Sequence, residues 1–363
     1  MVDPQWRIQR LWNTLKESRA KTRAHFAIPR DHIEHGDQLK GPFRKDEHYF
    51  QFIINEMFLA HDRIWFTEYA PMAYVTTNYR YSSNEKPQTV QFLAGPNILN
   101  QFKQDGIPRG MIFRNTPVSP LHPYRGGAVT FTIILNKLQR QNYAEKLLQV
   151  VERLAGAVDP TQAFTAYLSV AHVLLDSIEA LLDLRETMPV LGYRETINPD
   201  IGHIFQPTYY VIIDEDEHPI EHQKFWVRNS RLHYGQDLET SQPYNYHDFI
   251  LFSIVQATQL SDLSTLPFYP QWQTTEQLAR MPQLWEVPQL WEDVAAHYRA
   301  LVRSIWNSPD LTKPDRKRVI DDFRNQLDEL KEQARKVSRL GQKALPEEEA
   351  AFQRMFNETA RLA

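Results

Sequence analysis

The sequence predicts an α+β fold whose body is rich in antiparallel strands and whose C-terminus is an antiparallel helical hairpin. Two stretches, at about 64–135 and 208–234, are dense in aromatic and β-branched residues with Pro, Asn and Gly between them, which is typical of strands. Between these stretches, residues 142–184 carry apolar side chains with the period of helices. We therefore expect helices inserted into a body of antiparallel sheet.

Three segments are expected along the chain: a basic amphipathic helix at 1–28, an α+β body at 29–270 and a mostly helical region at 271–363. Residues 1–30 hold seven Lys or Arg and two acidic residues, so this segment carries +5 although the whole chain carries −4. Such a helix can dock on its own domain, enter a partner's groove or lie on a membrane surface. We favour docking on its own domain. Its candidate partner-binding residues are Arg7, Arg10 and Trp12.

The C-terminal region shows a heptad repeat at 312–362. Apolar residues at steps of three and four predict a first helix, and a second run after Gly341 repeats the pattern. Each run spans under three heptads, so a packing partner is required, in the hairpin itself, on the body or on another subunit. The candidate partner-binding residues are Phe323, Leu327, Leu330, Phe352 and Met355.

Several shorter segments are less clear from their pattern. Residues 49–63 fit a helix or a strand, 248–259 are apolar without a decisive period, and the Pro-rich stretch 260–290 is expected to be irregular. The sequence Arg228-Asn-Ser-Arg231 indicates a tight reversal between two strands.

The strongest catalytic motif is His218-Pro219-Ile220-Glu221-His222, which matches the H-x-x-E-H pattern of some zinc peptidases. On a helix the two imidazoles lie about 6 Å apart and can share a zinc ion. On a strand they lie about 13 Å apart and cannot. The flanking segments favour strands and Pro219 disfavours helical geometry at His218, so we expect an acidic hairpin turn. A zinc site and an acidic contact surface are the alternatives.

Three other clusters of polar residues could form binding sites, but we interpret them as solvent-exposed surface or as a turn. His32, Glu34, His35 and Asp37 lie in a loop-like segment and are expected to be solvated. Arg125 precedes two glycines and could bind an anion, but a turn into the next strand is the simpler interpretation. The row His172, Asp176, Glu179 and Asp183 fits the solvated face of a helix at 161–184.

Composition excludes several classes of function. The chain has no cysteine, and no phosphate-binding glycine motif or serine-nucleophile motif is present, so we expect no cofactor. The net charge of −4 argues against nucleic-acid binding. No apolar run is long enough to span a bilayer and no secretory signal is evident, which predicts a cytoplasmic protein.

The function expected from these observations is a non-enzymatic interaction or scaffold subunit of a bacterial multi-protein assembly. It would bind another protein chain, or a second copy of itself, through its terminal helices. Membrane contact through residues 1–28 is a weaker hypothesis. The alternative is a metal-dependent or acid/base hydrolase with a site around His218, Glu221 and His222. In that case His172 and Asp176, on the helix expected at 161–184, would have to lie in the same pocket.

Overall fold

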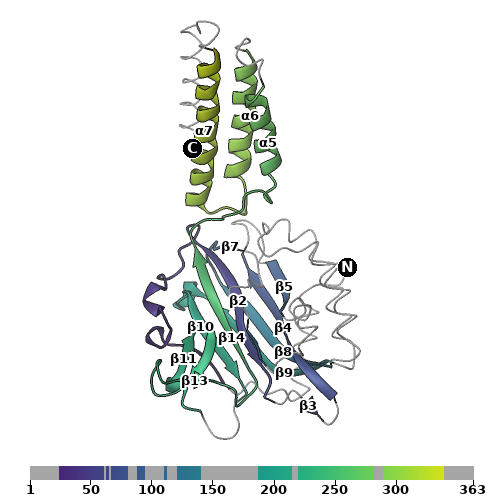
Figure 1. Cartoon of the computed structure of the whole chain (residues 1–363), viewed down its shortest axis with the longest axis vertical. Coiled ribbons are helices and arrows are strands. Elements are labelled where there is room, and N and C mark those ends of the chain that lie inside the picture. The colour runs from purple at the N-terminus through teal and green to yellow at the C-terminus, as the bar shows by residue number, and fades with distance from the viewer. Residues whose placement is uncertain are drawn as a thin grey trace. The chain divides into compact units, whose positions relative to one another are not determined.

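The computed structural model describes residues 24–60, 63–64, 67–80, 88–94, 110–112, 121–139, 187–214, 220–281 and 289–338. The chain divides into two compact units, Met1–Ala257 and Thr258–Ala363. We call the first the body and the second the helical unit. The body contains antiparallel sheets and the helical unit contains adjacent α-helices, so the fold class is α+β (Figure 1).

The largest sheet of the body is antiparallel and has six strands in the described residues. Its order is β1-β10-β14-β2-β6, and β7 also pairs with β2. The strands are β1 (Ala24–Ala27), β10 (Thr208–Ile213), β14 (Phe249–Ala257), β2 (Tyr49–Phe58), β6 (Gly110–Ile112) and β7 (His122–Pro123). The two segments whose sequence pattern did not decide between helix and strand are therefore strands: residues 49–58 form β2 and residues 249–257 form β14.

A second antiparallel sheet lies to the right of the first in Figure 1. Its order is β3-β4-β8-β9, and β5 also pairs with β4. The strands are β3 (Arg63–Ile64), β4 (Thr67–Tyr79), β5 (Gln88–Ala94), β8 (Val129–Gln139) and β9 (Thr187–Ile197). The sequence patterns had not indicated β9, which lies outside both predicted strand regions.

The core of the body is formed where these two sheets face each other. Phe131 on β8 lies between the sheets, with its ring centroid 5.3 Å from that of Phe52 on β2 and 5.5 Å from that of Phe252 on β14. Phe50 contacts Tyr79 across the same interface at 5.3 Å. All of these rings are at most 1% exposed. Packing of large aromatic rings thus holds the two sheets together as a sandwich.

A small sheet covers the opposite face of the six-stranded sheet. It consists of β11 (Phe225–Arg228), β12 (Arg231–Tyr234) and β13 (Gln242–Pro243). Phe225, Val227 and Leu232 pack onto residues of β10 and β14 in one buried cluster. The predicted reversal is confirmed, since Asn229 and Ser230 join β11 and β12 with φ of 50° and 59°. Short 3-10 helices occupy Arg30–His32, Gly36–Gln38, Pro199–Ile201 and His222–Lys224.

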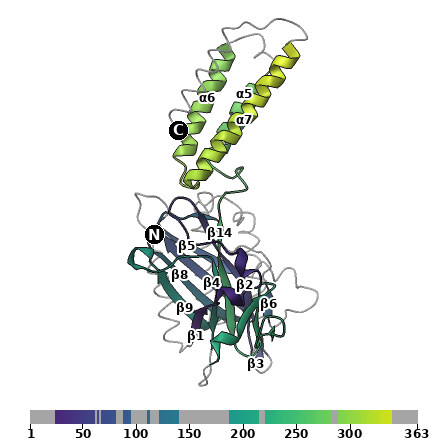
Figure 2. The ribbon, with the colours of Figure 1, turned by 90° about the vertical axis from the view of Figure 1, so that its left-hand side faces the viewer.

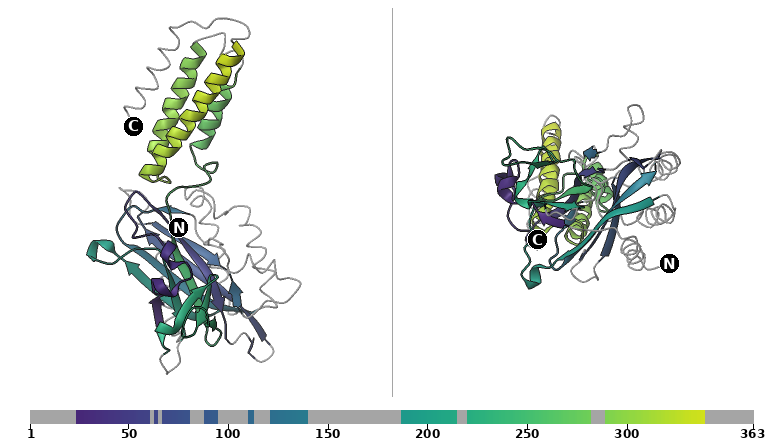
Figure 3. Two further views of the ribbon diagram at one scale, coloured as in Figure 1. Left: turned by 60° about the vertical axis from the view of Figure 1, so that its left-hand side comes forward. Right: turned by 90° about the horizontal axis from the view of Figure 1, so that it is seen from below.

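The helical unit contains α5 (Tyr269–Ala279), α6 (Gln289–Trp306) and α7 (Lys313–Ser338), which lie side by side in Figures 2 and 3. Residues 307–312 join α6 and α7, which run antiparallel. The ring of Phe323 on α7 stacks on Trp272 of α5, with centroids 4.2 Å apart and planes within 1°. The packing partner required by the short heptad repeat is thus provided, for α7, by α5 and α6.

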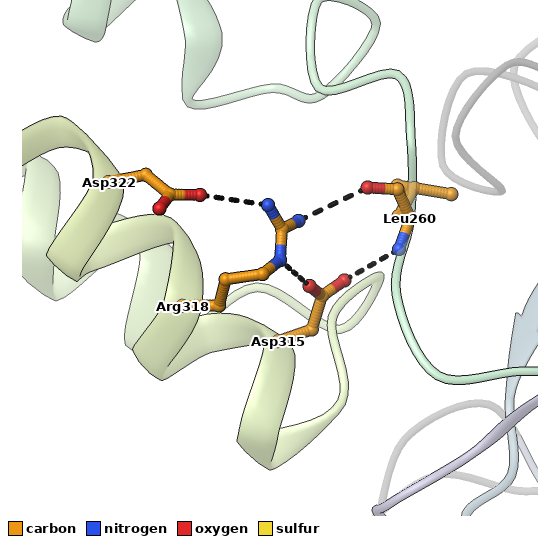
Figure 4. Close-up of polar contacts among 4 residues, drawn as sticks. All are labelled: Leu260, Asp315, Arg318 and Asp322. Atoms are coloured by element: carbon orange, nitrogen blue, oxygen red, sulfur yellow. Dashed lines mark hydrogen bonds and ion pairs between the residues drawn. The ribbon is translucent and has the colours of Figure 1, made fainter.

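A group of polar contacts ties the beginning of the helical unit to α7 (Figure 4). The buried carboxylate of Asp315 accepts hydrogen bonds from the backbone N–H of Leu260 at 2.8 Å and from Arg318 at 2.7 Å. Arg318 also donates to the carbonyl of Leu260 at 3.2 Å and to Asp322 at 2.9 Å. These contacts hold residue 260 in the helical unit and place the unit boundary after Ala257.

Two further sequence-based expectations are wrong in part, and two others concern residues that the structure does not describe. Residues 269–279 of the stretch expected to be irregular form α5. Residues 24–27, which were assigned to the N-terminal helix, form β1, so a helix there can extend only to residue 23. The inserted helices at 142–184 and the second run of the heptad hairpin, 342–362, lie outside the described residues.

Candidate functional site

The H-x-x-E-H segment is only partly described, because 215–219 and thus His218 lie outside the described residues. Glu221 forms an ion pair with Lys224 at 2.7 Å, and the His222 ring stacks on Phe26 with centroids 4.2 Å apart. The segment is not the tip of a hairpin, as the sequence had suggested, since β10 and β11 belong to different sheets. Within the described residues, no group of three or more His, Cys, Asp or Glu could hold a metal ion.

The loop at residues 29–37 binds the small sheet. His32 Nδ1 lies 3.0 Å from the carbonyl of Phe225, and its ring stacks on Trp226 with centroids 3.9 Å apart. Glu34 accepts a hydrogen bond from the backbone N–H of Asn229 at 2.6 Å. His32 and Glu34 therefore have structural partners, whereas His35 and Asp37 are exposed as expected.

The segment containing Arg125 forms a turn. Gly126 and Gly127 both have φ of +77°, a conformation that glycine adopts at little cost. The Arg125 side chain is 5% exposed, and its guanidinium group pairs with Asp46 at 3.0 Å. Its charge is thus balanced within the body, which supports the turn rather than the anion site. The row at 172–183 lies outside the described residues.

The body buries a carboxylate, Glu56, beneath the small sheet. A bulge in β2 at residue 55 places Ile54 opposite Phe252 and Glu56 opposite Leu251, so that the two side chains face opposite sides of the sheet. The carboxylate accepts hydrogen bonds from the N–H of Leu232 at 2.8 Å and from Arg231 at 3.3 Å. Burial raises the pKa of Glu56, and these two donors partly offset that rise.

Two further buried polar pairs lie between the sheets of the sandwich. Lys137 on β8 forms an ion pair with Asp248, just before β14, at 3.3 Å. The Asp248 carboxylate also accepts a hydrogen bond from the N–H of Ala60. His122 Nδ1 lies 2.6 Å from the hydroxyl of Tyr79, and burial lowers the pKa of His122 to about 3. His122 is therefore neutral near pH 7. The two pairs link β8 to the start of β14 and β4 to β7, so their role is structural.

The predicted partner-binding residues fall in different environments. Arg7, Arg10, Trp12, Phe352 and Met355 lie outside the described residues. Phe323 and Leu327 are 3% and 0% exposed and are used for packing within the helical unit. Leu330 is half-buried. Over residues 291–306 and 313–333, the exposed side chains of α6 and α7 are polar or charged apart from two alanines and a proline.

The two most exposed large aliphatic side chains of the described residues belong to one loop of the body, 198–206; the ring of Tyr246, which is 69% exposed, lies outside this loop. Ile201 is 71% exposed and Ile204 is 64% exposed. Short-range hydrogen bonds fix the loop: Asn198 accepts from the N–H of Asp200 at 3.1 Å, and the N–H of His203 donates to the carbonyl of Asn198 at 3.2 Å. The loop thus holds both isoleucines in water on a defined backbone.

Basic residues lie beside this loop. The backbone N–H of Phe43 donates to the carbonyl of Phe205 at 2.9 Å, and the two rings stack with centroids 4.3 Å apart. This contact brings segment 40–45 against the loop, and Lys40, Arg44 and Lys45 are all exposed. We call residues 40–45 and 198–206 together the apolar–basic surface.

Pattern reasoning missed this surface because neither segment carries a periodic signal. The only local indication was the pair of isoleucines in Asn198-Pro-Asp-Ile-Gly-His-Ile204, between turn-forming residues that indicate a loop. That Ile201 and Ile204 point into solvent, whereas Phe205 is buried, follows from the contacts of Phe205 with Phe43, Phe50 and Tyr124.

Comparisons with family models, with curated proteins and with solved structures found no match to this chain. None of the helices that the structure describes is long and apolar enough to cross a membrane.

Proposed function

We propose that the chain is a non-enzymatic interaction subunit that binds another protein chain within a multi-protein assembly. The observation that carries this proposal is the apolar–basic surface of the body. Exposed aliphatic side chains on a rigid backbone lose little conformational entropy on binding, and they lose unfavourable contact with water. The terminal helices, residues 1–23 and the heptad region, remain the further docking elements that the sequence predicts.

The chemistry of the surface indicates the kind of partner. Ile201 and Ile204 favour an apolar contact at the centre of an interface, where desolvated side chains contribute most of the binding energy. Lys40, Arg44 and Lys45 at its border favour acidic residues on the partner, which would accelerate association and orient it. Arg44 also forms an ion pair with Glu47 at 3.1 Å, but 68% of the Arg44 side chain remains exposed. We therefore propose a protein partner with an acidic and partly apolar surface.

Site-specific photo-crosslinking in cells of the native host tests this proposal. A photoreactive residue replaces Ile204 in one variant and Gln242, which is exposed on the small sheet, in a matched control. The proposal predicts a discrete adduct of higher mass at position 204 that is absent at position 242. It also predicts loss of that adduct when Ile201→Asp is added.

The same experiment can contradict the proposal. If positions 204 and 242 give the same background of adducts, or if Ile201→Asp leaves the adduct at 204 unchanged, the surface is not an interface. A truncation that removes α7 is a poor substitute for these variants, because Phe323 and Leu327 belong to the core of the helical unit.

A further inference from the structure

Four side chains with related chemistry meet at one lateral side of the sandwich. They are His25 on β1, Tyr193 and Glu195 on β9, and Tyr210 on β10. In the described strands, β1 and β9 are the outer strands of their sheets. This group therefore lies where the space between the two sheets meets the outside.

The strand register places all four side chains on the inner faces of the sheets. Tyr193 and Glu195 lie opposite Ile133 and Phe131 of β8, and Phe131 belongs to the core between the sheets. From the other sheet, Tyr210 lies opposite Phe252, which contacts Phe131. His25 lies opposite Ile212, two residues along β10 from Tyr210.

Direct contacts connect His25, Tyr193 and Glu195. The Tyr193 hydroxyl donates a hydrogen bond to Glu195 Oε2 at 2.8 Å. The His25 ring lies on Tyr193 with centroids 4.0 Å apart, and Tyr210 stacks on Phe252 at 5.1 Å. Burial raises the pKa of Tyr193, and it raises the pKa of Tyr210 to about 12. The nearby Glu195 carboxylate is a second, smaller cause of both shifts. Both phenols therefore remain protonated near neutral pH, and Tyr193 remains a donor to Glu195.

Glu195 differs from the buried carboxylates Glu56 and Asp248 because no basic side chain of the described residues neutralises it. Glu56 pairs with Arg231, and Asp248 pairs with Lys137. Among the described residues no Lys or Arg pairs with Glu195, whose hydrogen-bond partner is the neutral hydroxyl of Tyr193. The neighbouring Arg194 is exposed and, by strand alternation, points to the opposite face of the sheet. The carboxylate is half-buried beside aromatic rings, where its charge is less screened than in open solvent.

We propose that His25, Tyr193, Glu195 and Tyr210 form a binding site for an organic cation, an ammonium or a guanidinium group. The carboxylate provides the opposite charge, and aromatic rings attract cations through their electron-rich faces. The cation belongs either to a small amine or to a Lys or Arg side chain of a bound protein. This site is separate from the apolar–basic surface and does not depend on it.

Titration of the full-length protein with choline and with methylguanidinium, followed by isothermal calorimetry or by tyrosine NMR signals, tests the site. The neutral isostere of choline, 3,3-dimethylbutan-1-ol, is the control ligand. We expect at least one cation to bind and the neutral isostere to bind at least about tenfold more weakly, since one carboxylate contact to a cation is worth about one power of ten.

The matched variants are Glu195→Gln and Glu239→Gln. Gln keeps the size of Glu195 and an oxygen that can accept from Tyr193, so the fold is retained, which circular dichroism checks. Glu239 is exposed elsewhere on the body. We expect Glu195→Gln to weaken cation binding about tenfold and Glu239→Gln to leave it unchanged.

A blocked peptide containing one Arg and one containing one Lys distinguish the two sources of the cation. Tighter binding of either peptide assigns the site to a protein side chain, and tighter binding of the small cations assigns it to a free amine. The proposal is overturned if neither cation binds, if the neutral isostere binds equally well, or if Glu195→Gln and Glu239→Gln behave alike.

Discussion

In the body, buried charges meet across long stretches of sequence, whereas Asp315, a buried carboxylate of the helical unit, is neutralised close by in sequence. Glu56 and Arg231 are 175 residues apart, and the N–H of Ala60 reaches Asp248 across 188 residues. In the helical unit, Asp315 pairs with Arg318 one turn further along α7. A change to one buried charge in the body therefore disturbs two strands or sheets at once. In the helical unit the same kind of change disturbs the beginning of α7 and the segment at Leu260 that Asp315 holds.

The largest effect is expected from Asp248→Ala in the body. The substitution leaves Lys137 buried between the sheets without its counter-charge and removes the acceptor for the N–H of Ala60. We expect the free energy of unfolding to fall by about 4–5 kcal/mol. Urea unfolding measures this loss. Adding Lys137→Met should restore part of the stability, and a double variant that is less stable than the single one would contradict the explanation.

The helical unit should be most sensitive to loss of aromatic packing. Phe323→Ala removes the ring that stacks on Trp272 and leaves a cavity among α5, α6 and α7. The expected cost is about 3–4 kcal/mol in the unfolding of this unit, followed by the fluorescence of Trp272 and by helical circular dichroism. Asn325→Ala, at an exposed position of the same helix, is the control and should change stability by less than about 0.5 kcal/mol.

The stability of the body is expected to depend on pH because His122 is buried in its neutral form. The pKa of His122 is about 3 in the folded body and near its ordinary value of 6.5 when unfolded. Below pH 6.5 the unfolded chain binds a proton that the folded chain does not, so stability falls as pH falls toward 3. The contribution is about 2 kcal/mol between pH 6.5 and 5.

Urea titrations of the body at several pH values measure this slope. The double variant Tyr79→Phe with His122→Phe removes both hydrogen-bonding partners and should show a shallower fall over the same interval. An identical slope in the parent chain and in the double variant would assign the acid sensitivity to other groups.

At the beginning of the helical unit, Asp315→Ala should have a moderate effect. The N–H of Leu260 loses its acceptor and Arg318 loses one of its two carboxylate partners (Figure 4). We expect a loss of about 2 kcal/mol, since a buried donor would be left without a partner. Asp321→Ala changes an exposed carboxylate of the same helix and is the matched control. Equal thermal stability of the two variants would show that the contacts in Figure 4 contribute little.

The smallest effect is expected at the turn between β11 and β12. Ser230 has φ of 59°, which is unfavourable for a residue with a Cβ atom. Ser230→Gly should therefore stabilise the body by about 1 kcal/mol, measured as a rise in its melting temperature. Ser230→Ala should not stabilise it, because alanine keeps the strain.

Helix α7 was easier to predict from the sequence than α5, which lies in a stretch expected to be irregular. Val319, Ile320, Phe323 and Leu327 lie at helical spacing, and the structure buries all four on the inner side of α7. The turn at Asn229 and Ser230 was also predictable, since these residue types favour such turns. Helical periodicity and turn chemistry are local properties, which explains why a single sequence was sufficient for them.

The arrangement of the body could not be predicted in the same way. The bulge at residue 55 reverses which side chains of β2 face the sandwich, and no local pattern marks it. His25 meets Tyr193 and Glu195 only because two sheets meet face to face. The apolar–basic surface likewise depends on one contact between Phe43 and Phe205, far apart in the sequence.

Hydrogen exchange of the full-length chain, read by mass spectrometry, tests most directly whether the body and the helical unit have separate cores. We expect Phe323→Ala to accelerate exchange in α5, α6 and α7 and to leave exchange in β2, β10 and β14 unchanged. We expect the reverse for Asp248→Ala. If either variant accelerates exchange in both units to a similar degree, the two cores are energetically coupled, and the contrast between them is wrong.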